Sequence, residues 1–479
     1  MSKKDFDAIV VGSGPNGLAA AIELQRNGLR VLVVEAKSTI GGGLRTASLT
    51  LPGFQHDICS AIHPLCAASP YLSTLPLHEH GLEYIFPEIA AAHPFDDGQA
   101  AVLHRSLEKT AAGLGEDAQR YLNIFKPLLE TWPKIAPDVL APLHIPAKPI
   151  QMAAFGLKAM QPASFFAKHN FKTREARGLW AGMTAHSIQA LENLSTSAIG
   201  LVLMIAGHSK GWPIPKGGSQ SIANALSSYF QSLGGKVQTN FMVTNLSQLP
   251  SADAVLFDIA PKQLLKIAGH KFSSIYKWQL EKYKYGMGVY KMDWALDAEI
   301  PFKNDSCKRA ATVHLGGTLE EIASAERQAA RGKHPEKPFV LLAQQSAFDD
   351  TRAPEGKHTA WAYCHVPNGS TKSMEQAIED QIERFAPGFR DRILKKSIMD
   401  PAAMERHNPN YVGGDINAGL LDLSQLFTRP ALRYSPYKTS AKGLYICSAS
   451  TPPGPGVHGM SGFHAAKQVL KDFPHLRPL

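Results

Sequence analysis

A glycine-rich turn between two apolar runs is the feature that most constrains how this chain folds. The turn reads Gly12-Ser13-Gly14-Pro15-Asn16-Gly17; an apolar run of strand length precedes it, and residues 18–26 after it have the pattern of a helix. A second apolar run, residues 29–34, ends at Glu35. Strand, turn, helix and second strand in this order predict the β-α-β unit that holds the ADP half of a dinucleotide.

Each glycine of the turn has a physical task. Gly12 permits the tight turn, Gly14 lets a pyrophosphate approach the backbone, and Gly17 lets the helix pack closely on the strand. The first helical turn, with Pro15 and Asn16, presents free N–H groups and a partial positive charge to the phosphates. We therefore expect these residues to bind the cofactor.

A second glycine cluster follows Glu35 and separates FAD from NAD. Glu35, with Ala36 beside it, lies where a carboxylate accepts hydrogen bonds from both ribose hydroxyls. Gly41-Gly42-Gly43-Leu44-Arg45-Thr46 then lets the backbone pass under the pyrophosphate, while the Arg45 guanidinium neutralises it. The cluster is similar to the second signature of the glutathione-reductase-type flavoproteins, so FAD is the expected cofactor; a surface loop is the alternative. The expected contacts here are Gly42, Gly43, Leu44 and Arg45.

The composition is that of an ordinary globular protein, with 44% hydrophobic and 19% charged residues. Its 479 residues suffice for two domains with cores of their own. The net charge of +9 is not concentrated in a lysine and arginine block, so we expect no nucleic-acid partner. A basic surface also suits an anionic membrane or an acidic partner.

Five cysteines in a chain of this length predict reduced thiols and a cytoplasmic protein. The first apolar run is a strand rather than a signal peptide, and no other apolar run is long enough to cross a bilayer. Peripheral contact with a membrane stays open. We expect no metal ion, and the oligomeric state is left open.

The strand and helix pattern of the cofactor domain is interrupted and resumes twice. We predict a FAD-binding domain from residues 1–75, 207–270 and 435–479, and a substrate or cap domain from residues 76–206 and 271–434. The predicted fold class is α/β plus α+β. In it, a glutathione-reductase-type Rossmann domain is interleaved with a substrate domain of antiparallel sheet and helices. That sheet would include a long strand within residues 282–296 and further strands at 311–314, 339–344 and 359–366.

Two stretches of the substrate domain stand out. Five prolines within residues 132–149 predict that no long helix passes through this stretch. Residues 150–171 mix phenylalanine and methionine with basic side chains. This second stretch either lies on a membrane surface or forms a helical cap over the substrate cavity with solvated lysines.

Two segments are expected beside the flavin ring. The segment after Arg45 supplies Ser60, Ala61 and His63, although a capping or surface role is the alternative for His63. A glycine and proline loop before the last helix supplies Val457, His458, Gly459 and Met460. The N-terminus of that helix would stabilise negative charge on the reduced flavin. An ordinary C-terminal strand–helix unit is the alternative.

Together the motifs resemble the phytoene desaturase-like flavoproteins, in the branch named after a pyridine nucleotide-disulphide oxidoreductase domain. Besides the two glycine motifs, residues 215–218, 289–296, 312–321, 361–370 and 447–460 carry this resemblance, which covers nearly the whole chain. It implies bound FAD, a split FAD domain and redox chemistry on carbon–carbon bonds of apolar molecules. It also implies that a strand at Met242 and Val243 contacts adenine through its backbone.

The chain departs from the family pattern at one place. Many related flavoproteins have an aspartate after the last strand for the ribityl chain, whereas here Ser448-Ala449-Ser450 stands there. We expect Ser450 or a backbone N–H to substitute. Disulphide reduction is not expected, because Cys59 and Cys66 are separated by six residues in a weak context and no second dinucleotide motif follows a strand after residue 50.

The leading hypothesis is a FAD-dependent dehydrogenase that desaturates a carbon–carbon bond of an isoprenoid-like or long-chain substrate by hydride transfer to flavin N5. His458 is the first candidate for a general base, and His63 is the second. A flavin-dependent saturase or isomerase, an amine oxidase, and a non-catalytic flavin-binding interaction protein are the alternatives. The expected partners are an apolar small molecule and a membrane surface, with oxygen or a quinone as electron acceptor.

Overall fold

The structure is a computed structural model that describes residues 4–476. Within these residues, five parallel strands form one sheet in the order β16-β10-β1-β2-β9. The strands are β1 (Ala8–Val11), β2 (Val31–Val34), β9 (Lys236–Gln238), β10 (Ala254–Phe257) and β16 (Leu444–Ile446). β1 and β2 are apolar and buried throughout because helices cover both faces of this parallel sheet.

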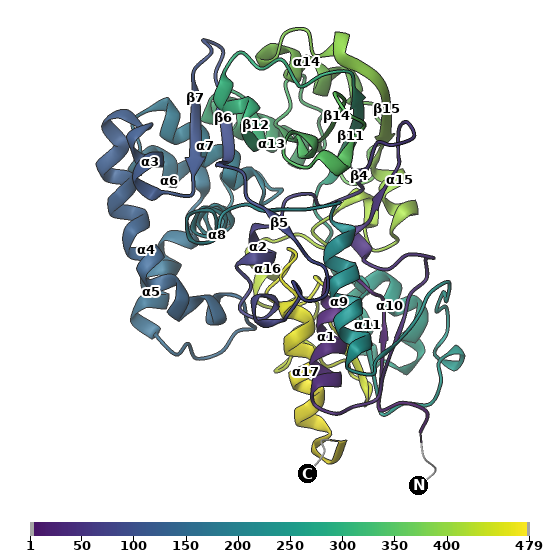
Figure 1. The fold of residues 1–479 in the computed structure, drawn as a ribbon. Coiled ribbons are helices and arrows are strands. Elements are labelled where there is room, and N and C mark those ends of the chain that lie inside the picture. Colours follow the sequence, from purple (N-terminus) through teal and green to yellow (C-terminus); the bar gives the residue numbers. More distant parts are fainter. Residues whose placement is uncertain (1–3, 477–479) are drawn as a thin grey trace.

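Different helices cover the two faces of the parallel sheet (Figure 1). On one face, α1 (Pro15–Arg26) packs against α9 (Gln220–Ser232) and α17 (Met460–Asp472). On the other face lie α10 (Pro261–Ala268) and α11 (Ser274–Glu281). The strands come from three separate segments of the chain. Because α11 begins after residue 270, this layer extends past the limit predicted for the second segment; the exact domain limits stay a prediction.

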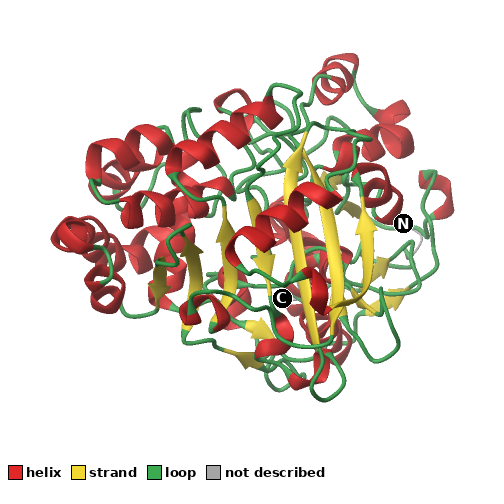
Figure 2. Cartoon of the chain, turned by 90° about the horizontal axis from the view of Figure 1, so that it is seen from above, coloured by secondary structure: helices red, strands yellow, loops and turns green. Residues whose placement is uncertain are grey.

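A mixed sheet of seven strands is the core of the second part of the described chain, in the order β15-β11-β14-β13-β12-β6-β7. Its strands are β6 (Ile89–Pro94), β7 (Ala100–His104), β11 (Gly288–Leu296), β12 (Ala310–Leu315), β13 (Val340–Ala343), β14 (His358–Val366) and β15 (Ile393–Met399). Within it, β6 and β12 are parallel and the other neighbours are antiparallel. The expected substrate-domain sheet is therefore confirmed, and Figure 2 shows helices on both sides of its strands.

A lobe of helices lies beside β7 (Figure 1). Its members are α3 (Leu107–Ala112), α4 (Ala118–Val139), α5 (Pro149–Ala159), α6 (Ala163–Asn170), α7 (Arg174–Ala185) and α8 (Thr196–Ser209). The expectation that prolines exclude a long helix here was wrong, because α4 continues through Pro127, Pro133 and Pro137. All three prolines are exposed, so the carbonyls that lose a backbone partner can face water while Trp132 and Ile135 keep the helix packed.

Shorter elements connect these layers. They are β3 (Thr46–Ala47), β4 (His56–Asp57), α2 (Pro64–Ala67), β5 (Tyr84–Ile85), β8 (Ile214–Pro215), α12 (Asp305–Lys308), α13 (Leu319–Ala330), α14 (Glu375–Phe385), α15 (Pro401–His407) and α16 (Leu423–Leu426). Two antiparallel pairs form among them, β3 with β4 and β5 with β8. Across residues 4–476, every helix is too short or too polar to span a membrane.

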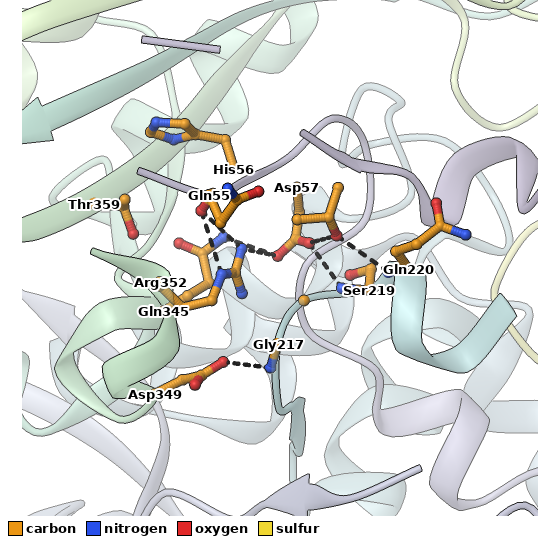
Figure 3. Close-up of polar contacts among 12 residues, drawn as sticks. Gln55, His56, Asp57, Gly217, Ser219, Gln220, Gln345, Asp349, Arg352 and Thr359 are labelled. Carbon is orange, nitrogen blue, oxygen red and sulfur yellow. Dashed lines mark hydrogen bonds and ion pairs between the residues drawn. The ribbon is translucent and has the colours of Figure 1, made fainter. Parts of the chain in front are cut away.

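A buried ion pair joins the two parts of the molecule (Figure 3). Arg352 Nη2 donates to Asp57 Oδ2 at 2.8 Å, and both side chains are fully buried. The other oxygen of Asp57 accepts from Ser219 N at 2.8 Å and from Thr46 Oγ1 at 2.7 Å. Burial alone would raise the pKa of Asp57, but the Arg352 charge and these hydrogen bonds lower it below the usual value. Asp57 is therefore charged at neutral pH and fixes three chain segments at one point.

Replacing Arg352 tests this junction. Arg352→Met leaves the Asp57 carboxylate buried without its charge partner, so we expect the unfolding free energy to fall by about 3–5 kcal/mol in urea titrations. Arg309→Met is the matched control, because Arg309 pairs with Glu88 at 3.5 Å and both side chains are 59% exposed. Equal stability of the two variants would contradict a structural role for the buried pair.

Candidate cofactor and substrate cavity

A cavity of about 840 Å³ opens at the carboxyl ends of β1, β2 and β10 and reaches the mixed sheet at β13 and β14. Ligands of open α/β sheets bind at the carboxyl ends of the strands, and this volume suits a cofactor with a substrate. The predicted site residues that line the cavity are Gly12, Gly14, Pro15, Asn16, Glu35, Ala36, Gly42, Gly43, Arg45, Ser60, Ala61, His63, Val243 and Val457. Their contacts with a ligand stay a prediction.

The turn before α1 needs its glycines for steric reasons. Gly12 has a φ of +102°, and a Cβ on Gly17 would lie 2.2 Å from the Gly12 carbonyl oxygen. Gly17 lies behind the cavity wall, where it allows the close packing of helix and strand that we predicted. Gly14 precedes α1 and has no side chain of its own to cap the helix. The Asp258 carboxylate instead accepts one N–H of the first turn, that of Gly17 at 2.9 Å, and both Gly14 and Asp258 line the cavity.

The carboxylate of Glu35 is held by several donors. Ser13 donates to Glu35 Oε2 through its backbone N at 3.1 Å and its Oγ at 2.6 Å. Arg45 Nη2 donates to Glu35 Oε1 at 3.0 Å and to the Thr39 carbonyl at 2.9 Å. We expected Arg45 to face a pyrophosphate. It instead pairs with Glu35, so it orients the carboxylate that we predict to bind ribose, and both side chains line the cavity.

Asp258, directly after β10, is a residue of the cavity wall that the sequence analysis missed. Its Oδ2 accepts the backbone N–H of Gly17 at 2.9 Å. Burial raises the pKa of Asp258 to about 7, against the lowering effect of that hydrogen bond. The proximity of Asp258 to the glycine turn depends on the order of strands in the sheet, which no local pattern shows.

The two glycine motifs meet through bare backbone. Gly42 has a φ of +56°, and a Cβ on it would lie 3.0 Å from the Cα of Gly14. Beside this contact, Asn16 Oδ1 is buried without a hydrogen-bond partner among the described residues. Glycine backbone without side chains at the carboxyl ends of the strands fits the diphosphate of FAD, whereas Asn16 Oδ1 can only accept a hydrogen bond and so suits a cofactor hydroxyl rather than a phosphate. The residues present therefore match the group that the sequence predicts.

His63 lies in the cavity wall with a defined tautomer. Ser219 Oγ donates to the Ser60 carbonyl at 2.6 Å, so the 2.8 Å bond between His63 Nε2 and Ser219 Oγ has the imidazole as donor. The free lone pair of His63 is thus on Nδ1, which has no partner among the described residues. Burial lowers the pKa of His63 to about 4, so the ring is neutral at pH 7. His63 is buried, so the surface role considered as an alternative was wrong; His63 does occupy the N-cap position of α2, but its side chain makes no capping hydrogen bond.

The C-terminal loop contributes less to the cavity than expected. Ser448, Ala449 and Val457 line the wall, whereas Ser450, His458, Gly459 and Met460 of the same segment do not. Leu44 of the second glycine motif does not line the cavity either. Ser450 Oγ donates to the Ala418 carbonyl at 3.0 Å, which removes it from the ribityl position. His458 Nδ1 accepts the backbone N–H of Met460 at 3.0 Å, an arrangement that orders the start of α17. Burial lowers the pKa of His458 to about 4, and the side chain does not line the cavity.

The helices α1 and α17 are in exceptionally close contact. A Cβ on Gly462 would lie 1.8 Å from the Asn16 carbonyl oxygen, and one on Gly459 would lie 3.0 Å from the Ala19 side chain. Gly459 is therefore required for packing and does not line the cavity, while its predicted contact with the flavin stays a prediction. Gly462 was not identified from the sequence, because a glycine within a helix pattern does not indicate what packs against it.

The end of the cavity at the mixed sheet is apolar and aromatic. Trp361 and Tyr363 of β14 pack edge to face with ring centroids 5.1 Å apart. Other apolar side chains that line the cavity on the substrate-domain side include Ile188, Leu203, Leu341 and Ile416, and Trp212 adds to them from the segment between α8 and α9. Cys59 and Cys66 also line the cavity, and both are free thiols.

A second cavity histidine, His186, follows α7 and was also missed by the sequence analysis. Its Nε2 lies 3.0 Å from Nε2 of His314, which belongs to β12. His314 Nδ1 is buried without a partner among residues 4–476. Burial lowers the pKa of His186 to about 3, helped by the nearby His365. A neutral imidazole supported by a second imidazole thus faces the cavity.

Replacing Gly42 tests whether the two glycine motifs, residues 12–17 and 41–46, hold the cofactor; we call them the FAD cradle. Gly42→Ala adds a Cβ at a positive φ and against Gly14, so we expect the affinity for FAD to fall by about tenfold or more. The measurement is the flavin absorbance retained per protein after dialysis. Gly156→Ala is the matched control, because a Cβ there meets nothing within 4 Å. Full flavin retention in Gly42→Ala would show that the close approach of Gly42 to Gly14 is not needed for FAD binding.

Asp258→Asn tests the buried carboxyl through its pH dependence. The folded-state pKa of about 7 lies above the ordinary value of 3.8, so the folded state binds the proton more tightly. The unfolding free energy of wild-type protein should therefore fall as pH rises from about 4 to about 7, and this contribution should be absent from the variant. Urea titrations of flavin-free protein at several pH values measure it. Parallel pH profiles for the two proteins would show that Asp258 is not the group responsible.

Comparisons with known proteins agree with this geometry. The model of an NAD(P)-binding Rossmann-like domain matches residues 10–75. Pyridine nucleotide-disulfide oxidoreductase domain-containing protein 2 of Mus musculus is 26% identical over 99% of this chain and 95% of its own length. Phytoene desaturase (neurosporene-forming) of Rhodobacter capsulatus is 22% identical over 98% of this chain and 94% of its own length.

Solved structures of flavin enzymes share this fold. Putrescine oxidase bound to putrescine superposes with a TM-score of 0.63 at 16% identity, covering 97% of this chain and 99% of that structure. Full-length sequence similarity, the shared fold and the cavity built on two glycine motifs identify a FAD-dependent oxidoreductase that is similar to the phytoene desaturases and has the fold of the amine oxidases.

Proposed function

We propose that this protein dehydrogenates a carbon–carbon bond of an apolar, isoprenoid-like or long-chain substrate. The observation that carries the proposal is the continuity of one cavity, which joins the FAD cradle to a chamber lined by aromatic and aliphatic side chains. Such a chamber binds hydrocarbon by excluding water and offers few polar groups to a hydrophilic substrate. The similarity to a phytoene desaturase supports the same class of substrate.

The chemistry divides between the cofactor and the chain. When bound, FAD supplies the acceptor for the hydride that leaves a substrate C–H bond. The substrate carbon that loses hydride becomes electron-poor, and the Tyr363 ring in the cavity wall can stabilise positive charge there, whereas Lys291 Nζ already lies 5.7 Å from the Trp361 ring centroid. A proton on the neighbouring carbon then leaves to a base, and its bonding electron pair forms the new double bond. The aliphatic side chains hold the substrate in the orientation that both departures require.

Three neutral histidines line the cavity; His407 lies near Arg45 and Lys37, which leaves two as proton acceptors at the substrate end. His63 and His186 both line the cavity, and burial lowers their pKa values to about 4 and about 3. They are weak bases, but a proton next to an electron-poor carbon is acidic enough for a weak base. His186 has the more accessible position, because Nδ1 of His63 is fully buried. We therefore propose His186 ahead of His63 and both ahead of His458.

The proposed substrate also suggests where the protein works. Long-chain and isoprenoid hydrocarbons partition into lipid bilayers, so an enzyme that uses them gains by contact with a membrane surface. We propose a peripheral association of this kind, with oxygen or a quinone of the same membrane as electron acceptor.

Anaerobic mixing of the purified yellow protein with a panel of isoprenoids and long-chain lipids tests the function. We expect the flavin absorbance to bleach with at least one apolar compound, and mass spectrometry of the product to show the loss of two hydrogens. Bleaching by amines alone would instead establish amine oxidation. Turnover that requires a previously reduced flavin would indicate a saturase or isomerase. Absence of bleaching by every donor would leave a non-catalytic flavin protein.

Histidine variants test the proton acceptor with a donor found in that panel. We expect His186→Ala to slow substrate-driven flavin reduction by about 100-fold or more, since this is the usual contribution of a positioned base. His63→Ala and His458→Ala are measured beside it. The control is His78→Ala, because that side chain is 79% exposed. Unchanged reduction in all three variants would exclude His186, His63 and His458 as the base.

A further inference from the structure

The helix α5 presents an apolar stripe to solvent. Ile150, Ala153, Ala154 and Leu157 recur at the spacing of one helix face, and all four are exposed. Ile150 is 81% exposed and Leu157 is 74% exposed. The opposite face already packs into the lobe through Phe155 and Ala159. A helix that only caps a cavity needs one apolar face, so the outer stripe requires a separate explanation.

The loop before α5 continues this apolar surface. Leu143 is 77% exposed and Ile145 is 92% exposed. Between them, His144 Nε2 bonds to Asp138 Oδ1 at 2.8 Å, and Asp138 Oδ2 accepts the backbone N–H of Ala147 at 2.9 Å. These bonds fix the loop while its two large aliphatic side chains stay in solvent. We call Leu143, Ile145, Ile150, Ala153, Ala154 and Leu157 the α5 patch.

The charges around the patch have one sign. Residues 139–172 contain four lysines and no aspartate or glutamate. Lys168 and Lys172 lie within 4 Å of Glu320 and Glu116, whereas Lys148 and Lys158, at the two ends of α5, make no ion pair with a described residue. Asp138, the acid that precedes this stretch, is occupied by the loop. Two unpaired cations thus flank the apolar stripe.

We propose that the α5 patch docks on the surface of an anionic lipid bilayer, with α5 lying in the plane of the interface. Such helices combine one buried apolar face with lysines whose stems reach toward the lipid phosphates. The composition favours lipid over a protein partner, because protein interfaces are enriched in tyrosine, tryptophan and arginine and depleted of lysine and alanine. α5 also lies at the outer edge of the helical lobe, where a flat surface can reach it (Figure 1).

This inference deepens the proposed function, since it names the surface and lipid charge for the membrane contact suggested there. Its evidence is independent of the substrate, and binding to vesicles needs no flavin turnover. A protein that binds vesicles but oxidises nothing, or one that oxidises a soluble donor but ignores vesicles, would separate the two proposals.

The test is flotation of the full-length holoprotein with vesicles of phosphatidylcholine alone and with added phosphatidylserine. We expect wild-type protein to float with the anionic vesicles and to be released by salt. Ile145→Ser/Leu157→Ser should weaken this binding by about tenfold or more, because two aliphatic side chains no longer leave water. Lys148→Glu/Lys158→Glu should abolish the preference for phosphatidylserine.

The matched control is Leu432→Ser/Tyr434→Ser, which removes two apolar side chains that are 72% and 101% exposed but lie far from α5 in the sequence. This variant should bind like the wild type. The flavin absorbance and melting temperature of each variant establish that it is folded. Absence of flotation, equal binding of patch and control variants, or a dimer that Ile145→Ser/Leu157→Ser converts to a monomer would each overturn the proposal.

Discussion

The ion pair of Asp57 and Arg352 is the contact on which the arrangement of the two parts depends. It is buried from solvent, and its carboxylate also accepts bonds from the backbone before α9 and from Thr46 beside the second glycine motif. A buried pair of this kind adds little net stability compared with apolar packing, but breaking it strands a charge. Any other relative position of cradle and chamber would separate the two charges, and its free energy would be higher because a buried charge would lose its partner. A cavity that must align a ring with a substrate bond requires that uniqueness.

Within that frame, backbone rather than side chains shapes the cofactor end, and side chains shape the substrate end. The backbones of Gly14 and Gly42 are in contact with no side chain between them, so phosphates can approach both chain segments. At the other end Trp361, Tyr363 and two neutral imidazoles meet an apolar volume. Burial keeps these imidazoles uncharged, which preserves the affinity of the chamber for hydrocarbon.

Local patterns predicted the parts of the site that depend on neighbours in the chain. The glycine turn, Glu35, the strands of the parallel sheet and four strands of the mixed sheet follow from short-range sterics and periodicity, whereas β6, β7 and β15 were not predicted. Asp258, His186 and His314 could not be found in this way, because strand order and long crossovers bring them to the cavity. For His458 the local pattern placed the loop correctly but not the side chain. The loop reaches the cavity wall at Val457, whereas the His458 side chain accepts the backbone N–H of Met460. The prolines of α4 show that tertiary packing can override a local breaker.

The contact of α17 with α1 has a consequence for the cradle. Asn16 of the nucleotide turn has as its close neighbour Gly462, which is remote from it in the chain. Strand β16, which completes the sheet beside β10, is equally remote. The helix α1 therefore needs a partner from a distant part of the chain before its packing is complete. The shape of the cradle thus depends on a helix that does not itself line the cavity.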